Sequence, residues 1–317
     1  MMHHILAIGI AMMLDRLIGD PPHWPHPVRW IGKYIYKAAE LLNKGPHAYR
    51  NGFLMVGSLI VIVFLTVAGA VFLAYLVHPF LGVAAEAVLI ASGLAQKSLQ
   101  VAAEDVYRPL VNKNLDEARH KLSWIVGRDT RHLDESEITR GVVETVSENT
   151  SDGITAPLFW AFLLGAPGLW VYKAVNTCDS IVGYKNEQFR QFGFASARLD
   201  DLLNFVPSRI TGFLILMLTV NRRKLSIPGR LKEWIQYAPQ HPSPNSGWLE
   251  AATAVQLGVR LGGENSYGGV SSFRAYMGLP VYQLEASHIK EAVTHMQIAS
   301  WAFFILFAMG GIIIEFA

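Results

Sequence analysis

A run of 25 residues without a charged side chain, at positions 53–77, limits the folds open to this chain more than any other feature. About 20 apolar residues are enough to cross the hydrocarbon core of a bilayer, and the backbone can do so only with its hydrogen bonds satisfied internally. A buried helix of a soluble protein would not need so long an uninterrupted run. The sequence therefore predicts a membrane-spanning helix over residues 53–77.

The composition of the 317 residues agrees with a membrane protein. Charged residues make up 16% and hydrophobic residues 51%, whereas soluble domains carry roughly 25% charged residues. The 27 basic and 25 acidic residues leave a net charge of +2, too small a surplus for nucleic-acid binding by bulk charge. The single cysteine, Cys178, excludes an intramolecular disulfide and a cysteine-rich zinc site.

Other apolar segments complete the predicted membrane topology. Residues 298–314 form a second clear span, and residues 80–103 are expected to return as a hairpin helix that packs on protein, since they include Glu86. Residues 5–14 lack a basic flank, so we expect a short membrane or core helix rather than a cleaved signal peptide. Residues 154–175 and 205–220 contain prolines and could each span, re-enter or lie at the interface.

Basic residues set the expected orientation. Lys33, Lys37, Lys44 and Arg50 precede the first span, which places that side in the cytoplasm. The hairpin then returns the chain for the polar stretch 104–152. We therefore expect a multi-pass protein of the cytoplasmic membrane whose active site faces the cytoplasm.

The polar part is expected to be helical as well. Residues 28–44, 104–122 and 133–149 have helical spacing of apolar residues, and Asp134 or Ser136 could cap the last of these helices. No strand-like alternation recurs often enough to build a sheet. The predicted fold is all-α: one integral-membrane domain over residues 1–317, with polar helices and loops forming a site.

Acidic residues stand next to one of the apolar segments. Glu144, Glu148 and Asp152 follow at intervals of four, which would stack three carboxylates on one helix face. Like charges at that spacing need a cation, a metal ion or a raised pKa. The alternative is a solvent-exposed acidic face whose charge is compensated by Arg140 or Arg128, but the neighbouring apolar segment favours a functional role.

Two further polar sets follow later in the chain. Asp200, Asp201 and Asn204 present hard oxygen ligands one turn apart, which suits Mg²⁺ bridged to phosphate, although a helix-capping pair is nearly as good an interpretation. The pattern N-T-x-D occurs at 149–152 and again at 176–179. A set that could hold an anion consists of Asn176, Asp179, Tyr184, Lys185, Asn186 and Arg190.

Two turn-rich motifs remain. In the proline-rich segment 19–29, His23 and His26 could be counted as zinc ligands, but the intervening proline and the missing cysteines favour a structural corner. The glycine-rich segment 262–269 allows either a close approach of the backbone to a ligand or a tight turn. No Walker A motif occurs, so a nucleotide would be held by another device.

Taken in order, these motifs resemble the CobD/CbiB family of membrane proteins, the adenosylcobinamide-phosphate synthases. The matching stretches are LDRLIGDPPHWPHPVRWIGKYI, IVGRDTRHLDESEITRGVVETVSENTSDGITAPLFW, AVNTCDSIVGYKNEQFRQFGFASARLDDLLNFVPSRIT and HPSPNSGWLEAATAVQLGVRLGGENSYGG. They run from residue 14 to residue 269. Several separately spaced motifs in one order are far more specific than any single one.

The resemblance implies an enzyme of cobalamin biosynthesis that joins a propionate carboxylate of adenosylcobyric acid to (R)-1-aminopropan-2-ol or its O-phosphate, with ATP as co-substrate and Mg²⁺ as cofactor. Such a reaction needs metal ligands, phosphate-binding cations, a base and oxyanion donors. The residues proposed for metal and phosphate chemistry are Glu148, Asp152, Asp179, Asp200 and Asp201, with Arg128, Lys185 and Arg190. One carboxylate or His26 is proposed as the base. Arg29 and Arg209 are proposed to bind the phosphate of the amino alcohol. Asn149, Asn176 and Asn245 are proposed to orient the substrate or to donate to the oxyanion.

Two other functions fit parts of the sequence. An intramembrane prenyltransferase would hold Mg²⁺-diphosphate on aspartate-rich helices, but the ordered motif set argues against it. A corrinoid transporter would place ionisable groups at the membrane midplane, and only Glu86 is so placed. The sequence leaves open the amino alcohol, the base and the oligomeric state.

Overall fold

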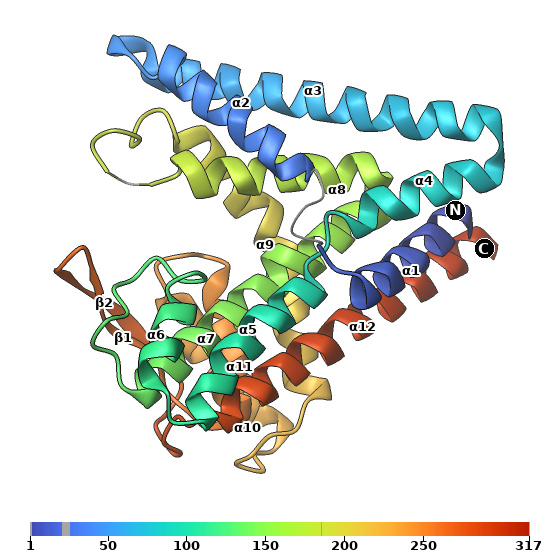
Figure 1. Ribbon diagram of the computed structural model, residues 1–317. Helices are drawn as coiled ribbons and strands as arrows, with labels where there is room; N and C mark the ends of the chain where they lie inside the picture. The colour runs from blue at the N-terminus through green and yellow to red at the C-terminus, as the bar shows by residue number, and fades with distance from the viewer. Residues whose placement is uncertain (1, 21–25, 185, 317) are drawn as a thin grey trace. The chain divides into compact units, whose positions relative to one another are not determined.

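The computed structural model describes residues 2–20, 26–184 and 186–316 and is predominantly helical (Figure 1). Its elements are α1 (Met2–Leu17), α2 (Pro27–Leu42), η1 (Gly45–His47), α3 (Ala48–Val77), α4 (Pro79–Ala91), α5 (Gln96–Val111), α6 (Leu115–Leu122), α7 (Glu135–Thr150), η2 (Ser151–Thr155), α8 (Ala156–Val182), α9 (Phe194–Leu218), α10 (Ile227–Tyr237), η3 (Ala238–Gln240), α11 (Ser246–Leu257), β1 (Leu261–Tyr267), β2 (Val270–Met277) and α12 (Ser287–Phe316).

Within these ranges, five helical runs are long and apolar enough to cross a membrane. They are Gly45–Val77, Pro79–Val111, Glu135–Val182, Phe194–Leu218 and Ser287–Phe316. The predicted polytopic helical membrane fold is thus confirmed, and both clear spans, 53–77 and 298–314, lie inside single helices. The cytoplasmic orientation stays a prediction.

Helix α1 contains the ambiguous segment 5–14. It is 16 residues long and buries Ile5, Ile8 and Met12. This face packs against α4, whereas Leu6, Met13 and Leu17 on α1 are exposed. The alternatives of a short membrane helix and a core helix therefore both remain predictions.

The structure corrects two predicted helices. The return helix 80–103 is interrupted, because α4 ends at Ala91 and α5 begins at Gln96. Gly93 lies in this break. Because Gly93 has no side chain, the side chain of Leu169 can pack close to its backbone. The predicted helix 104–122 is also two helices, separated where Lys113 has a positive φ of 60°. By contrast, the N-cap predicted for residues 133–149 is confirmed, since Asp134 Oδ1 accepts a hydrogen bond from the Glu137 amide at 2.8 Å.

Contacts within the chain define two compact units, each built from separate segments. Unit 1 consists of residues 1–95, 156–204 and 306–317, and unit 2 of residues 96–155 and 205–305. The expectation of a single catalytic domain stays a prediction.

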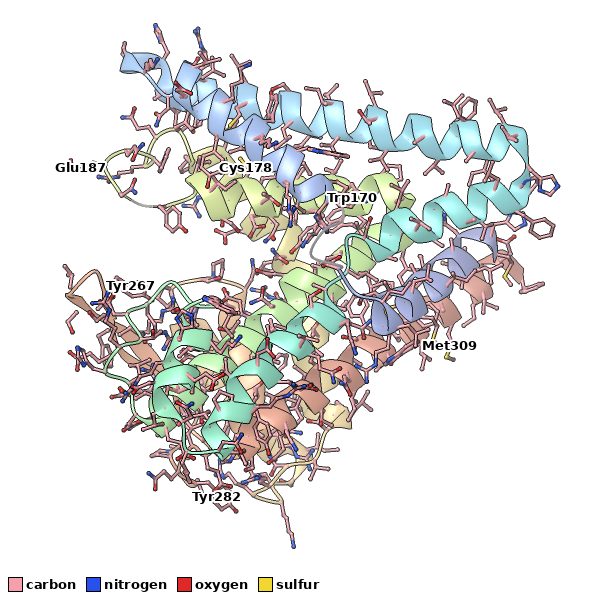
Figure 2. All side chains as sticks on the ribbon, in the orientation of Figure 1. Trp170, Cys178, Glu187, Tyr267, Tyr282 and Met309 are labelled. Carbon is pink, nitrogen blue, oxygen red and sulfur yellow. The ribbon has the colours of Figure 1, made fainter. Side chains whose placement is uncertain are left out.

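In unit 1, α3 and α4 form a hairpin, α1 packs along α4, and α2 and α8 pack on α3 (Figure 1). Trp170 and Cys178 both lie on α8 (Figure 2). Ala7, Val83 and Ala87 form a small core cluster covered by Tyr75. Unit 1 is therefore an assembly of packed helices.

A kink in α8 explains the buried Glu86. Gly165 adopts φ 68° and ψ −160°, which breaks the helix before Pro167. Glu86 of α4 accepts a hydrogen bond from the Ala166 amide at 3.3 Å and one from the Tyr75 hydroxyl at 3.1 Å, and His4 Nδ1 lies 2.9 Å from its carboxylate. The acid thus satisfies the broken backbone, so its position needs no transport function to explain it.

In unit 2, α7 packs against α5, α6 and α11, and α10 packs against α11. Gly141 of α7 lets Leu122 of α6 approach closely. The unit also holds an antiparallel hairpin, β1 with β2, that the sequence analysis did not anticipate in its glycine-rich segment. Its turn is Gly268-Gly269, both with positive φ, and the strands pair Tyr267 with Val270.

Candidate functional site

The predicted site residues are distributed over both units. Unit 1 contains His26, Arg29, Asn176, Asp179, Arg190, Asp200 and Asp201, and unit 2 contains Arg128, Glu148, Asn149, Asp152, Arg209 and Asn245. Lys185 lies outside the described residues. Convergence of all these residues in one pocket stays a prediction, and each unit is described in turn.

In unit 1, α8 and α9 bring together an acidic and amide group. Asp200 is 9% exposed and accepts hydrogen bonds from Asn176 Nδ2 at 3.1 Å and from Asn204 Nδ2 at 3.2 Å. The Tyr172 hydroxyl donates to Asn204 Oδ1 at 2.9 Å. Asp179 is close enough to both Asp200 and Asp201 to interact electrostatically. Residues from two predicted motifs therefore do meet in this unit.

A glycine makes room for one of these carboxylates. A Cβ atom on Gly183 would collide with Oδ1 of Asp179. The lack of a side chain at Gly183 thus allows Asp179 to hold its position at the end of α8.

The donor chemistry of this group fits Mg²⁺ in one form. Among the residues that can be described, no three His, Cys, Asp or Glu side chains form a ready-made metal cage. Mg²⁺ usually keeps several waters and uses only one or two protein carboxylates together with substrate phosphates. A shared site of this kind would take one or two carboxylates from Asp179, Asp200 and Asp201, and the role of these residues as Mg²⁺ ligands stays a prediction.

The other predicted residues of unit 1 lie at turns or on the surface. His26 Nδ1 accepts from the Val28 amide at 3.3 Å and caps α2, and its Nε2 lies 3.5 Å from Asp20 Oδ1. His26 also lines a cavity of about 260 Å³ together with Asp15 and Asp20. Arg29 and Arg190 are exposed. The structural-corner interpretation of His26 is thus supported, and its role as a base stays a prediction.

In unit 2, Glu144 forms the centre of a buried ionic group. It is 3% exposed and pairs with Arg128 and, at 3.4 Å, with Arg140. Gly262 of the hairpin donates its amide to Glu144 Oε1 at 2.8 Å, and its carbonyl accepts from Arg140 at 2.6 Å. Both arginines considered in the alternative interpretation are the partners of Glu144, but the face is buried and not solvated.

The predicted stack of three carboxylates is interrupted. Glu148 follows Glu144 on α7 and accepts from the Ser246 hydroxyl at 2.8 Å. Asp152 lies beyond the end of α7 in η2, a π-helical turn whose wider spacing breaks the four-residue repeat. Only Glu144 and Glu148 share the helix, so the prediction of one continuous acidic face was wrong at Asp152.

Three predicted residues gather near the start of α11. Arg209 donates to Asn245 Oδ1 at 2.8 Å and to the Pro244 carbonyl at 3.0 Å, with its guanidinium 3.7 Å above the Phe205 ring. Ser246 follows Asn245 in the chain, and its hydroxyl donates a hydrogen bond to the carboxylate of Glu148. Asn149 instead donates to the Thr145 carbonyl of its own helix at 2.8 Å.

Sequence reasoning missed the most deeply buried acid, Glu250. Its Oε1 lies 3.5 Å from His241 Nε2, and within the described ranges neither carboxylate oxygen has a hydrogen-bond partner. Burial, and then the nearby Glu144 and Glu148, raise the pKa of Glu250 well above its usual value, while Arg274 opposes the shift. One signal was available, because Glu250 is the single charged residue of α11.

His241 and Arg274 respond to the same surroundings. Burial and then Arg274 lower the pKa of His241, which favours the neutral form of its ring. Burial acts to lower the pKa of Arg274, but the carboxylates of Glu250, Glu144 and Glu148 raise it overall. The group therefore holds a neutral imidazole next to a carboxyl that favours its protonated form.

Glu250→Gln should flatten the dependence of stability on pH. The folded state holds the Glu250 proton more tightly than the unfolded state, so stability falls as pH rises above about 4.5 toward the raised folded pKa. Across that window the loss is about 1.4 kcal/mol per pH unit, and glutamine has no proton to lose. Unfolding midpoints measured in detergent from pH 5 to pH 9 test this. Glu40→Gln, at an exposed position, is the control, and equal slopes for wild type and Glu250→Gln would contradict the assignment.

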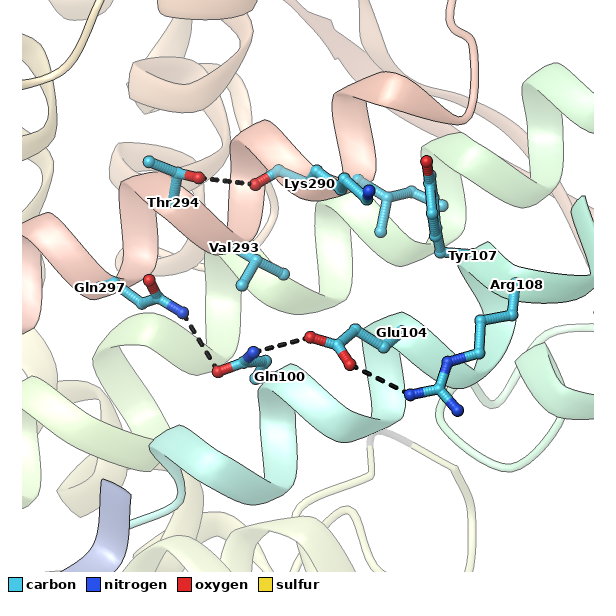
Figure 3. Close-up of a pocket in the computed structure, with 9 residues that line it drawn as sticks. Gln100, Glu104, Tyr107, Arg108, Lys290, Val293, Thr294 and Gln297 are labelled. Atoms are coloured by element: carbon cyan, nitrogen blue, oxygen red, sulfur yellow. Dashed lines mark hydrogen bonds and ion pairs between the residues drawn. The ribbon is translucent and has the colours of Figure 1, made fainter. Parts of the chain in front are cut away.

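A cavity of about 420 Å³ lies between α5 and α12 in unit 2 (Figure 3). A hydrogen-bonded chain runs along it from Gln297 through Gln100 and Glu104 to Arg108. Lys290 lies over the Tyr107 ring at 4.5 Å. None of the predicted site residues lines this cavity.

Comparisons with known proteins decide the family. The family model described as CobD/Cbib protein matches residues 8–296. The chain belongs to the CobD/CbiB family. It is 51% identical over 311 residues to "Cobalamin biosynthesis protein CobD" of Halalkalibacterium halodurans, covering 98% of each chain. It is 44% identical over 300 residues to proteins of Klebsiella pneumoniae, named CobD, and Salmonella typhimurium, named CbiB, covering 93% of this chain and 94% of each relative.

The resemblance read from the ordered motifs is thereby confirmed. No solved structure matches the chain. The four motif stretches that carried the resemblance, from residue 14 to residue 269, lie within the matched range.

Proposed function

We propose that this CobD/CbiB protein is a membrane enzyme of cobalamin biosynthesis, an adenosylcobinamide-phosphate synthase. It would join a propionate carboxylate of adenosylcobyric acid to (R)-1-aminopropan-2-ol or its O-phosphate in an amide bond. The observation that carries the proposal is the nearly full-length match to relatives named as cobalamin biosynthesis proteins. Acidic and amide side chains of the kind that such a reaction needs occur in each unit taken by itself.

The reaction balances with ATP as co-substrate. A carboxylate is a poor electrophile, so an oxygen of the propionate would first take the γ-phosphoryl group of ATP, releasing ADP. The amine nitrogen then attacks the acyl carbon, the carbon–oxygen bond to phosphate breaks, and inorganic phosphate leaves. The proton lost by the amine passes to a base.

The acidic group of unit 1 would serve the nucleotide. One or two of the carboxylates of Asp179, Asp200 and Asp201, together with phosphate oxygens of ATP, would hold Mg²⁺, which when bound neutralises phosphate charge. Asn176 and Asn204 keep the Asp200 carboxylate in one orientation through their two hydrogen bonds. In this way a small number of fixed oxygens would position the metal without a closed protein cage.

The α11 region of unit 2 would serve the amine and the oxyanion. Glu148 is half-buried and its carboxylate is held by the Ser246 hydroxyl, which supports it as the group that would accept the amine proton. Arg209 donates a hydrogen bond to Oδ1 of Asn245 and thereby orients this side-chain amide. The NH₂ group of Asn245 would then donate to the tetrahedral oxyanion. His26 and Asp152 remain alternative bases.

Mass spectrometry of products tests the proposal. Purified full-length protein in detergent is incubated with adenosylcobyric acid, ATP, Mg²⁺ and either amine, and the expected product has the mass of the amide. Omission of ATP should abolish it. No amide with either amine would contradict the proposal, transfer of labelled prenyl diphosphate would favour the prenyltransferase, and uptake of unchanged corrinoid into proteoliposomes would favour the transporter.

A further inference from the structure

A polar cavity in unit 2 lies outside the residue groups considered so far, except for one arginine. It has a volume of about 490 Å³, within the range of about 300–1,000 Å³ typical of small-molecule sites. It is formed by α6 and by the loop that follows it. Its ionisable lining residues are Asp116, Arg119, His120, Arg128, Asp129 and Arg131.

Both acidic residues of this lining are already engaged by the protein. Asp116 pairs with Arg119 at 2.9 Å. Asp129 accepts hydrogen bonds from the Ser266 hydroxyl at 2.6 Å and from the amides of Gly269 and Gly268 at 2.8 Å and 3.2 Å. Asp129 therefore holds the hairpin turn, and its charge is distributed over three donors.

The basic residues hold different depths in the cavity. Arg128 is 8% exposed and is fixed at the base by Asn265 at 2.6 Å and by Glu144. Arg119 is anchored by the Leu133 carbonyl at 2.9 Å. Arg131 and His120 are exposed at the rim. A ligand would thus meet two guanidinium groups that are already held by the carboxylates of Asp116 and Glu144, together with the exposed side chains of His120 and Arg131.

Arginine clusters of this kind suit a particular ligand. The planar guanidinium group binds phosphate in a bidentate manner, and fixed arginines lose little side-chain entropy on binding. The Ser123 hydroxyl and the buried Thr130 also line the cavity. An apolar ligand would leave these polar groups without compensation.

We propose that this cavity, bounded by Arg119, His120, Arg128 and Arg131, binds a phosphate group of a substrate. The proposal rests on the proposed function for its two candidate sources, which are the triphosphate of ATP and the phosphate ester of the amino alcohol. Of the four basic residues, the sequence motifs had pointed only to Arg128. The cavity adds Arg119, His120 and Arg131 as phosphate-binding residues.

Direct binding measurements test the site without requiring turnover. The full chain in detergent is titrated by calorimetry with a non-hydrolysable ATP analogue, with aminopropanol O-phosphate, with inorganic phosphate and with unphosphorylated aminopropanol. Arg131→Glu should weaken binding of the phosphate-bearing substrate at least tenfold, because it replaces a favourable charge by a repulsive one. Ser123→Glu, which adds a carboxylate to the same cavity, should weaken it similarly.

A matched arginine provides the control. Arg108 is also exposed and lines a polar cavity of unit 2, so Arg108→Glu should leave all four affinities within twofold of wild type. An effect on the ATP analogue alone identifies the triphosphate, and an effect on aminopropanol phosphate alone identifies the ester.

Two results would overturn the site. One is that wild type binds none of the phosphate compounds, and the other is that Arg131→Glu and Ser123→Glu bind them as wild type does. If binding falls in these variants but no amide is ever formed, the site stands and the proposed reaction fails. If amide is formed but the variants bind and turn over normally, the reaction stands and the site fails.

Discussion

Replacing Asp179 with asparagine should lower kcat for amide formation by about three orders of magnitude while leaving the protein folded. Asparagine keeps the size of the side chain at the end of α8, where Gly183 leaves room for it. It replaces a carboxylate oxygen, which is a metal ligand in the proposed site, by an NH₂ group that cannot bind a cation. The loss of one preorganised electrostatic group typically costs about 10²–10³ in kcat. Product formation is followed by mass spectrometry, and folding by thermal unfolding in detergent.

A nearby carboxylate offers the control for this variant. Glu187 is exposed in the loop between α8 and α9 (Figure 2), so Glu187→Gln should keep wild-type turnover. Full turnover in Asp179→Asn would remove Asp179 from the site. The same assay applied to Asp152→Asn tests unit 2, where activity at the wild-type level would exclude Asp152 as a ligand or base.

Arg128→Ala should destabilise the protein by about 3 kcal/mol. The substitution leaves the carboxylate of Glu144, which is 3% exposed, without one of its two guanidinium partners. Removing one member of a buried ion pair typically costs about 3–5 kcal/mol, because the remaining charge stays desolvated. Arg140 and the Gly262 amide still hold Glu144, which places the expected cost at the lower end. Equilibrium denaturation in detergent measures the free energy of unfolding.

A double-mutant cycle separates the charge effect from lost packing. Glu144→Gln combined with Arg128→Ala should be less destabilised than the sum of the two single variants, since neither charge is then left unpaired. Arg131→Ala, three residues away and exposed, should change stability by no more than about 0.5 kcal/mol. A loss below 1 kcal/mol in Arg128→Ala, or strict additivity in the cycle, would show that the pair does not bear the buried charge of Glu144.

Local signals predicted much of the fold. The uncharged runs 53–77 and 298–314 lie within α3 and α12. Segments of this length and composition can satisfy their backbone hydrogen bonds in lipid only as helices. The Asp134 cap depends only on neighbouring residues and was predictable for that reason. The break at Gly93 was not predicted. The close approach of Leu169, from a helix distant in sequence, becomes visible only in the tertiary structure.

The candidate site shows the same division. The motif containing Asn176 and that containing Asp200 were recognised separately, and their hydrogen bond joins two helices. Glu250 escaped notice because a single acid in an apolar helix gives no pattern until His241 and Glu144 are seen around it. Likewise, the alternation needed to predict the β1–β2 hairpin is hidden by its glycines.

By itself, the sequence determined the membrane character, the helical class and, through the order of its motifs, the family. These properties depend on length, composition and spacing along the chain, which are local quantities. Only the tertiary structure decided that Glu144 is a buried ion-pair centre and that Glu250 lacks hydrogen bonds among the described residues. It also decided that beside the basic cavity Asp116 is ion-paired and Asp129 is hydrogen-bonded to the hairpin turn. The charge state and availability of a side chain depend on its desolvation and on partners from remote segments, and folding alone brings those together.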